Sequence, residues 1–327
     1  MASPKPRKGN RNAAKRDRNA KAEEAKWKAR RAGSAMGAAA SGGKGRPKPP
    51  PRTGGAQTRM RSAVPERSAS SGSRSSAKGL GGDQVEGRQA VRELLLGGRR
   101  VRELWLVEDD KGPLADIAEL ALELRIPVKQ VSAGKLAGAA RSESPQGVLA
   151  RCDELEEVDL DVLLAARPGG AAPFLLAVDG VTDPGNLGAL IRSAECNGVT
   201  GLILPRHRSV HVTPTVAKAA AGAIEHVPMT VVPGLPAALE RAKRSGAWVI
   251  GLDGGGERRI DQVELAAEPV VLVLGAEGAG LSTLVRRRCD IVAAIPLRGR
   301  LGSLNVAAAG AIATYEVARR RLDAAAQ

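Results

Sequence analysis

Apolar residues recur in segments of helix and strand length from about residue 80 onward, and this alternation predicts an α/β fold. In the first part, segments 89–98 and 113–125 have apolar residues at helical spacing, the second with Pro113 at its start. Strands are predicted at 102–109, 127–131 and 147–152. Together these segments indicate a small α/β domain over residues 80–152.

Apolar strands and helices also alternate in the second part of the chain, residues 173–327. Strands that are apolar throughout and separated by helices are typical of a parallel sheet covered on both faces. The segment between the two parts, 153–172, mixes acidic residues with Pro and Gly, which predicts an interdomain linker. Strands are predicted at 174–181, 201–205, 227–232, 247–253, 269–275 and 291–297, and helices at 187–198 and 303–321.

The charge of the chain is unevenly distributed. The chain carries 50 Lys and Arg against 35 Asp and Glu, and the formal charge of +15 indicates a polyanionic partner. Residues 1–79 hold 21 basic and 4 acidic side chains and few large apolar ones, so we expect a disordered tail that tethers a polyanion non-specifically. Residues 80–172 hold 12 basic and 17 acidic side chains, so a contact with a polyanion there must use a local patch.

Cysteine usage and hydropathy indicate the compartment. The three cysteines are odd in number and lack CxxC spacing, which argues against a disulfide scaffold or a zinc ribbon. No apolar run approaches the roughly 20 residues of a membrane span, and the N-terminus lacks the apolar core of a secretory signal. We therefore expect a cytoplasmic protein in a reducing compartment that does not enter a membrane.

Several conspicuous side chains are interpreted structurally. The histidines have no carboxylate or cysteine at matching spacing, so no metal site is predicted. Cys196 lies within a predicted helix and is expected to be a small buried residue. Arg286 and its two neighbours lie at a predicted helix C-terminus and are expected to balance its dipole. The histidines are His207, His211 and His226.

Three loops that follow predicted strands combine Gly, Pro and polar residues, and ligands bind at that end of parallel strands. Taken singly, each has a structural interpretation, because Asn186 can cap a helix, Arg192 can be solvated and Ser303 can be an N-cap. The glycine-rich loop follows the penultimate strand, which argues against a dinucleotide fold. The loops are DPGNLGALIRSAE at 183–195, LGAEGAGLS at 274–282 and IPLRGRLGSLNVAAAG at 295–310.

Together, and in this order, the three loops resemble the motifs of the SpoU branch of the knotted SPOUT RNA methyltransferases. The N-terminal part, EGRQAVRELLLGGRRVRELWL through SPQGVLARC, is similar to the L30e-like substrate-binding domain of members that act on ribosomal RNA. VTPTVAKAAAGAIEHVP at 212–228 resembles members that methylate guanosine in the large subunit. The resemblance implies a parallel-sheet methyltransferase domain with a trefoil knot, a homodimer, and S-adenosylmethionine as methyl donor without a metal.

The resemblance also implies roles for individual residues. We expect Arg192 to clamp an RNA phosphate and stabilise the developing alkoxide, with Asn186 orienting it, although deprotonation by Arg192 stays open. Glu277 is expected to fix its loop or hold Arg192. The small domain reads Ser144-Pro145-Gln146-Gly147 where relatives commonly have a His before the Gln. Implied catalytic or substrate-facing residues are Asn186, Arg192, Glu277, Ser303 and Asn305, and donor-binding residues are Gly251, Leu252, Leu274, Gly275, Gly278, Ile295, Leu297 and Leu304.

The functional prediction is 2′-O-methylation of a ribose, with guanosine in large-subunit ribosomal RNA as the leading substrate. Within the same reaction class, a transfer-RNA ribose methylase and a ribosomal-RNA methylase that confers antibiotic resistance remain open. A non-catalytic ribosome-assembly or RNA-binding factor that kept the fold is the alternative from another class. The intact polar residues of the three loops argue against that last alternative.

Overall fold

The computed structural model describes residues 79–108, 112–166, 171–207, 209–264 and 268–325. The tail predicted over 1–79 lies outside these residues except for its last position. The described residues all belong to one compact unit. No helix in the described ranges is long and apolar enough to span a bilayer.

The small sheet has four strands in the order β1-β4-β2-β3. Strands β2 and β3 are parallel, whereas β4 pairs with β1 and β2 in antiparallel fashion. The helices predicted at 89–98 and 113–125 are confirmed as α2 and α3, whereas strand β1 and helix α4 were not predicted. The elements are β1 (Gln84–Glu86), α2 (Arg88–Gly97), β2 (Val101–Val107), α3 (Ala115–Glu123), β3 (Val128–Val131), α4 (Ala133–Ala139) and β4 (Val148–Cys152).

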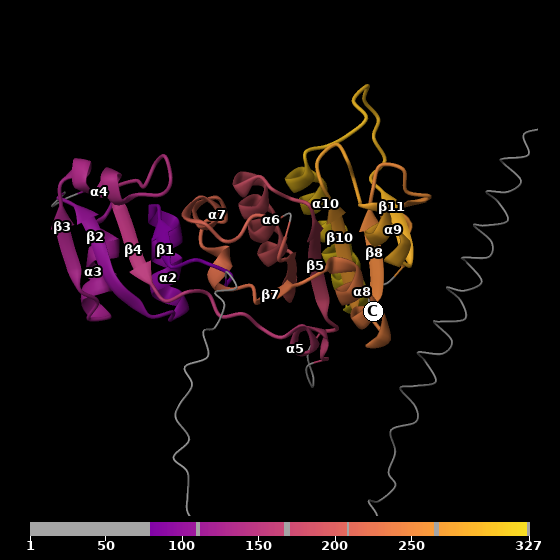
Figure 1. The fold of residues 1–327 in the computed structure, drawn as a ribbon, viewed down its shortest axis with the longest axis horizontal. Helices are drawn as coiled ribbons and strands as arrows, with labels where there is room; N and C mark the ends of the chain where they lie inside the picture. Colours follow the sequence, from indigo (N-terminus) through magenta and orange to yellow (C-terminus); the bar gives the residue numbers. More distant parts are fainter. Residues whose placement is uncertain (1–78, 109–111, 167–170, 208, 265–267, 326–327) are drawn as a thin grey trace, which may run out of the picture. The chain divides into compact units, whose positions relative to one another are not determined.

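The large sheet has seven strands in the order β7-β6-β5-β10-β8-β11-β9, and every pair is parallel. Figure 1 labels β7, β5, β10, β8 and β11 of this sheet. This confirms the parallel sheet that the apolar strands predicted. Strand β10 lies between β5 and β8, so the loops after these strands emerge at one edge. The strands are β5 (Phe174–Asp179), β6 (Gly201–Pro205), β7 (Met229–Val232), β8 (Trp248–Leu252), β9 (Arg258–Arg259), β10 (Val270–Gly275) and β11 (Ile291–Ala294).

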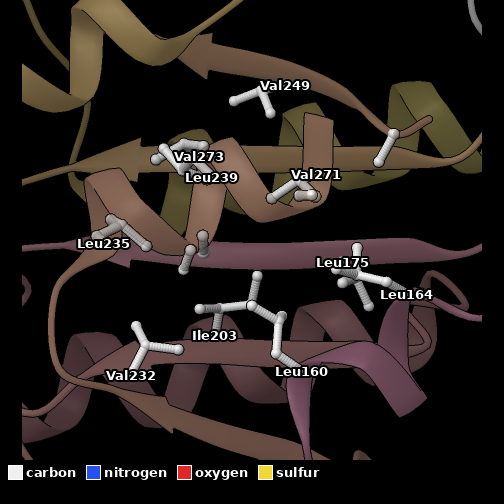
Figure 2. Close-up of a cluster of buried hydrophobic side chains, with 14 of the residues drawn as sticks. Leu160, Leu164, Leu175, Ile203, Val232, Leu235, Leu239, Val249, Val271 and Val273 are labelled. Carbon is white, nitrogen blue, oxygen red and sulfur yellow. The ribbon is translucent and has the colours of Figure 1, made fainter. Parts of the chain in front are cut away.

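Alternate residues of the central strands face two different helical layers. Val271 and Val273 of β10 are fully buried in a cluster with Leu239 of α8 (Figure 2). On the other face, α10 approaches so closely that a Cβ on Gly310 would lie 2.8 Å from Leu274 Cδ1 and 2.2 Å from Leu190 Cδ2 of α6. The helices are α6 (Pro184–Cys196), α7 (Pro214–Ala219), α8 (Leu235–Arg244), α9 (Thr283–Arg288) and α10 (Val306–Ala325), with 3-10 turns η1 (Ala223–Glu225) and η2 (Ile260–Gln262).

The segment interpreted as a linker, 153–172, contains a helix that belongs to this core. Helix α5 (Leu160–Leu164) buries Leu160, Leu163 and Leu164 in the same cluster as α8. Its N-cap is Asp159, which accepts a hydrogen bond from the Asp161 amide. Leucines at this spacing lie on one face of a helix. Their burial decides the structure of this segment, although the neighbouring acidic, Pro and Gly residues are typical of a linker.

Candidate functional site

A cavity of about 400 Å³ opens at the carboxyl ends of strands β8 and β10. Its walls come from three loops, at 252–255 after β8, 274–280 after β10, and 295–309, which leads into α10. The volume is within the range of small-molecule sites. The residues predicted to bind the donor that line it are Leu252, Leu274, Gly275, Gly278, Ile295, Leu297 and Leu304.

The glycines after β10 are required by a tight turn. A Cβ on Gly275 would lie 2.2 Å from the Gly280 carbonyl carbon, closer than any real Cβ contact. The turn is closed by the Ala276 amide, which donates to the Gly280 oxygen at 3.1 Å, and by the reciprocal bond at 2.9 Å. Gly278 and Gly280 have φ values of 76° and 66°, which favour glycine. One wall of the cavity is therefore made of closely packed backbone.

Gly251 is the one residue predicted for donor binding that is not among the described residues lining the cavity. A Cβ on Gly251 would lie 2.6 Å from Leu281 Cδ1 and 2.7 Å from Cys289 Sγ. Burial raises the pKa of the Cys289 thiol to about 12, so this sulfur serves as a packing group. Gly251 lets α9 and its flanking residues pack closely behind the β8 strand, as a glycine within a strand often does.

Three of the predicted polar residues meet beside the cavity. The Asn305 side-chain amide donates to the Asn186 oxygen at 2.9 Å, and the Asn186 amide donates to the Glu277 carboxylate at 3.3 Å. Glu277 and Ser303 line the cavity itself. This cluster joins the start of α6, the loop after β10 and the start of α10, and its side chains are exposed or half-exposed, so a polar substrate can reach them.

The helix caps differ from those expected. Asp183, rather than Asn186, caps α6, because its carboxylate accepts from the Asn186 amide at 2.7 Å. Asn305, rather than Ser303, caps α10, because its side-chain oxygen accepts from the Ala307 amide at 2.8 Å. The spacing of apolar residues placed the first residues of α6 and α10 at 187 and 303, three residues from where they lie, because helix ends are weakly encoded by such spacing. The Asn186 and Ser303 side chains are thereby left available to the cavity region.

Arg192 makes no hydrogen bond or ion pair with this cluster among the described residues. It is exposed on α6, and in the described part of the chain it makes no hydrogen bond or ion pair. In that part of the chain, no hydrogen bond or ion pair joins Arg192 to Asn186 or Glu277, and these two side chains bond each other. Cys196, expected to be buried, is also exposed. Cys196 is the last residue of α6. The spacing of apolar residues in this helix did not show that the cysteine side chain is exposed.

Two residues next to the cavity were not predicted as parts of the site, although Arg286 does lie in the last turn of α9 as expected. Asp253 lines the cavity directly after β8, where a carboxylate at a strand end is a recognisable signal. Arg286, interpreted as a dipole partner, forms an ion pair with Asp253 at 2.9 Å. Partial burial alone raises the pKa of Asp253, but hydrogen bonds from the Gly255 and Leu281 amides, together with Arg286, outweigh it and lower the pKa. The carboxylate is therefore held in its charged form.

The three histidines do not form a metal centre in the described ranges. Among those residues, no group of three or more His, Cys, Asp or Glu side chains is placed to hold a metal ion. His226 instead contacts the Glu93 carboxylate at 3.2 Å.

Comparison with protein families gives matches over both sheets. A sequence model of the SpoU rRNA Methylase family matches residues 173–315. A second model, described as RNA 2'-O ribose methyltransferase substrate binding, matches residues 84–158. The two matches follow each other in the chain, and the first contains all three motif loops.

Individual proteins are similar over most of their length. The 23S rRNA (guanosine-2'-O-)-methyltransferase RlmB of Pseudomonas aeruginosa is 39% identical over 73% of this chain and 97% of its own. YacO of Bacillus subtilis, provisionally named a TrmH family tRNA/rRNA methyltransferase, is 37% identical over 73% and 96%. The crystal structure of the SpoU methyltransferase AviRb from Streptomyces viridochromogenes with AdoMet has a TM-score of 0.62 and 28% identity, over 73% of this chain and 90% of its own.

Proposed function

Because this chain belongs to the SpoU rRNA methylase family, we propose that it transfers a methyl group from S-adenosylmethionine to the 2′ hydroxyl of a guanosine in 23S ribosomal RNA. The observation that carries this proposal is the adjacency of a backbone-walled cavity and the cluster of Asn186, Glu277 and Asn305. The substrate assignment is supported by the Pseudomonas relative, and the donor by the AdoMet-bound AviRb structure.

The cavity suits the donor in size and chemistry. A nucleoside with an attached amino acid needs apolar contacts for its base and polar groups for its ribose and charged end. The cavity offers apolar side chains from Leu252, Leu274 and Ile295, and backbone amides and carbonyls from the loop at 275–280. When bound, the donor supplies an electrophilic methyl group. The seven predicted residues that line the cavity would hold it there.

The polar cluster would orient the acceptor ribose. Methyl transfer requires the hydroxyl oxygen to lie in line with the carbon–sulfur bond that breaks, and positioning of this kind can supply much of the rate enhancement. Glu277 and Ser303 line the cavity and so can hydrogen-bond the ribose or the base, while Asn186 holds Glu277 in place and is itself held by Asn305. The new bond from the ribose oxygen to the methyl carbon would form as the carbon–sulfur bond breaks, and the hydroxyl proton would pass to solvent water at the cavity opening.

Arg192 would bind RNA rather than the donor. Its guanidinium is exposed and has no partner among the described residues, so it is available to clamp a phosphate with two hydrogen bonds and to stabilise charge on the attacking oxygen. Arg192→Lys keeps the charge but not the bidentate geometry. We expect turnover to fall at least about tenfold in this variant, since each kcal/mol lost in the transition state lowers the rate severalfold. Near wild-type turnover would contradict the clamp.

The architecture and assembly are proposed on the same family basis. Residues 80–152 would be the L30e-like RNA-binding domain and 173–327 the methyltransferase domain with its trefoil knot, in a cytoplasmic protein.

A homodimer is supported by an exposed apolar stripe on α10, which a second copy would cover. The stripe consists of Ile312, Tyr315 and Leu322, exposed by 43%, 60% and 72%.

The homodimer is tested by the mass in solution. Tyr315→Glu places a charge in the stripe and should convert the dimer to a monomer in light scattering. Leu122→Glu, at a leucine 77% exposed on α3, is the matched control and should leave the mass unchanged. A monomeric wild-type protein would overturn this part of the proposal.

The function is tested by mapping ribose methylation in a strain that lacks the gene. We expect one 23S ribosomal RNA guanosine to lose its methyl group, and the purified full-length protein with S-adenosylmethionine to restore it on RNA from that strain. Loss of a methyl group from transfer RNA alone would reassign the substrate. If no RNA loses a methyl group and the protein does not bind the donor, a non-catalytic RNA-binding role would replace the proposal.

A further inference from the structure

Asp253 bridges two walls of the cavity. Its Oδ1 accepts from the Gly255 amide at 2.9 Å, within the loop after β8. Its Oδ2 accepts from the Leu281 amide at 3.2 Å, at the end of the turn after β10. Both loops contribute lining residues, so one carboxylate connects two otherwise separate parts of the site.

Arg286 holds this carboxylate from behind. Its Nη1 lies 2.9 Å from Asp253 Oδ1, and its Nη2 donates to the Gly255 carbonyl at 3.1 Å. The planar guanidinium thus binds the side chain at the start of the loop and the backbone two residues later. A lysine could make only one of these contacts with the same geometry.

The surroundings leave the carboxylate little freedom. The Asp253 side chain is 18% exposed, and a Cβ on Gly280 would lie 2.7 Å from Oδ2. Three donors point at its two oxygens, which is the environment that keeps a partly buried carboxylate charged. The direction of its pKa agrees with this geometry. Arg286 is not among the described residues that line the cavity, so any effect it has on a ligand must pass through Asp253 and Gly255.

We propose that Arg286 and Asp253 form a positioning pair that fixes the relative placement of the loops 252–255 and 274–280, and thereby sets the affinity for the methyl donor. The inference rests on the proposed function, since it concerns the same cavity. Preorganisation of this kind improves binding because the loops need not be ordered when the ligand arrives. Arg286 is a positioning residue, and it touches neither donor nor RNA.

The test compares two arginines of the same helix. Arg286→Met removes the guanidinium behind the cavity, whereas Arg288→Met removes an exposed ion pair with Glu240, 3.1 Å long, as the matched control. S-adenosylmethionine binding to the full-length protein is measured by calorimetry. Methylation of 23S ribosomal RNA is measured over a range of donor concentrations, and unfolding is followed without donor.

We expect Arg286→Met to raise the donor Kd and KM by at least about tenfold, as the loss of hydrogen bonds to a charged group suggests. The kcat at saturating donor and the KM for RNA should stay within about twofold of wild type, as should all parameters of Arg288→Met. Arg286→Lys should fall between wild type and Arg286→Met. A merely structural role would lower the melting temperature without this split between KM and kcat.

Two results would overturn the inference. One is an unchanged donor Kd in a folded Arg286→Met, and the other is an equal loss of affinity in Arg286→Met and Arg288→Met. If Arg286→Met does not fold, the donor Kd of Asp253→Asn is measured instead. This variant keeps the size of the side chain and one acceptor oxygen but weakens the ion pair with Arg286. An unchanged donor Kd in that variant also overturns the inference. Failure of the proposed function is distinguishable, because wild type itself would then not bind the donor.

Discussion

The Asn305 side chain donates a hydrogen bond to the Asn186 side-chain oxygen across 2.9 Å, although the two residues are 119 positions apart in the chain. Asn305 also caps α10 through its own side-chain oxygen. The Asn305 side-chain amide therefore caps the helix that follows the loop at 295–305 and also bonds this loop to the first turn of α6. The glycine-rich loop at 274–282, the second motif, joins through Glu277, which Asn186 contacts at 3.3 Å.

The two tasks of Asn305 can be separated by substitution. Asn305→Ala loses the cap and the bond to Asn186, so we expect about 1 kcal/mol less stability and at least about tenfold slower methylation. Asn305→Asp keeps a good cap but cannot donate to Asn186, so it should retain stability and still be slow. Urea unfolding and turnover at saturating donor check this. An Asp variant as fast as wild type would show that the bond to Asn186 has no part in catalysis.

Gly275→Ala should distort the cavity in which we propose that the donor binds. Its Cβ would lie 2.2 Å from the Gly280 carbonyl carbon, so the turn after β10 must move. We expect a stability loss of about 1–3 kcal/mol, typical of overpacking, and donor binding weaker by more than about tenfold. Gly302→Ala is the control, because it lines the same cavity and a Cβ there meets nothing within 4 Å. Calorimetry on both variants measures the difference, and equal affinities would contradict the prediction.

The stability contributed by Asp253 should depend on pH. Amide hydrogen bonds and Arg286 outweigh the effect of burial and lower the pKa of this carboxyl in the folded protein. A carboxyl with a lowered folded pKa stabilises the fold above its unfolded pKa of about 3.9, and this is lost as pH falls through the folded value. The melting-temperature advantage of wild type over Asp253→Asn should be constant above about pH 5 and shrink below about pH 4. An advantage that grows on acidification would contradict the assignment.

Arg321 should contribute more to stability than any exposed arginine of α10. Its guanidinium donates to the carbonyls of Ala172, Pro173 and Glu268, and lies 5.1 Å from the Phe174 ring centroid. Burial lowers its pKa. Arg321→Met leaves three carbonyls without this partner, so we expect a loss of about 3 kcal/mol in urea unfolding.

Arg319→Met is the matched control for Arg321. Arg319 is more exposed and pairs with Glu316 and Asp323 on the same helix, contacts that contribute about 0.5 kcal/mol each. A similar loss in both variants would mean that the carbonyl contacts of Arg321 add nothing beyond helix propensity.

Much of the fold follows from local pattern. Runs such as 201–205 and 269–275 are apolar throughout, and both became strands of the parallel sheet. Part of the cavity lining could also be predicted, because Leu274 and Gly275 belong to a motif that resembles the family and follows a recognisable strand. Helix α5 was missed because its three leucines are surrounded by acidic residues, and its burial depends on α8, more than 70 residues later in the chain.

Local periodicity and contiguous motifs were enough to predict the alternation of most strands and helices, the parallel sheet, the family and the loops that line the cavity. The contacts among polar groups could be known only from the folded chain. Folding paired Asn305 with Asn186, bonded Asn186 to Glu277, and placed Arg286 beside Asp253. Such contacts join residues far apart in the chain through the close approach of β8, β10 and α10, and no local pattern encodes that distance.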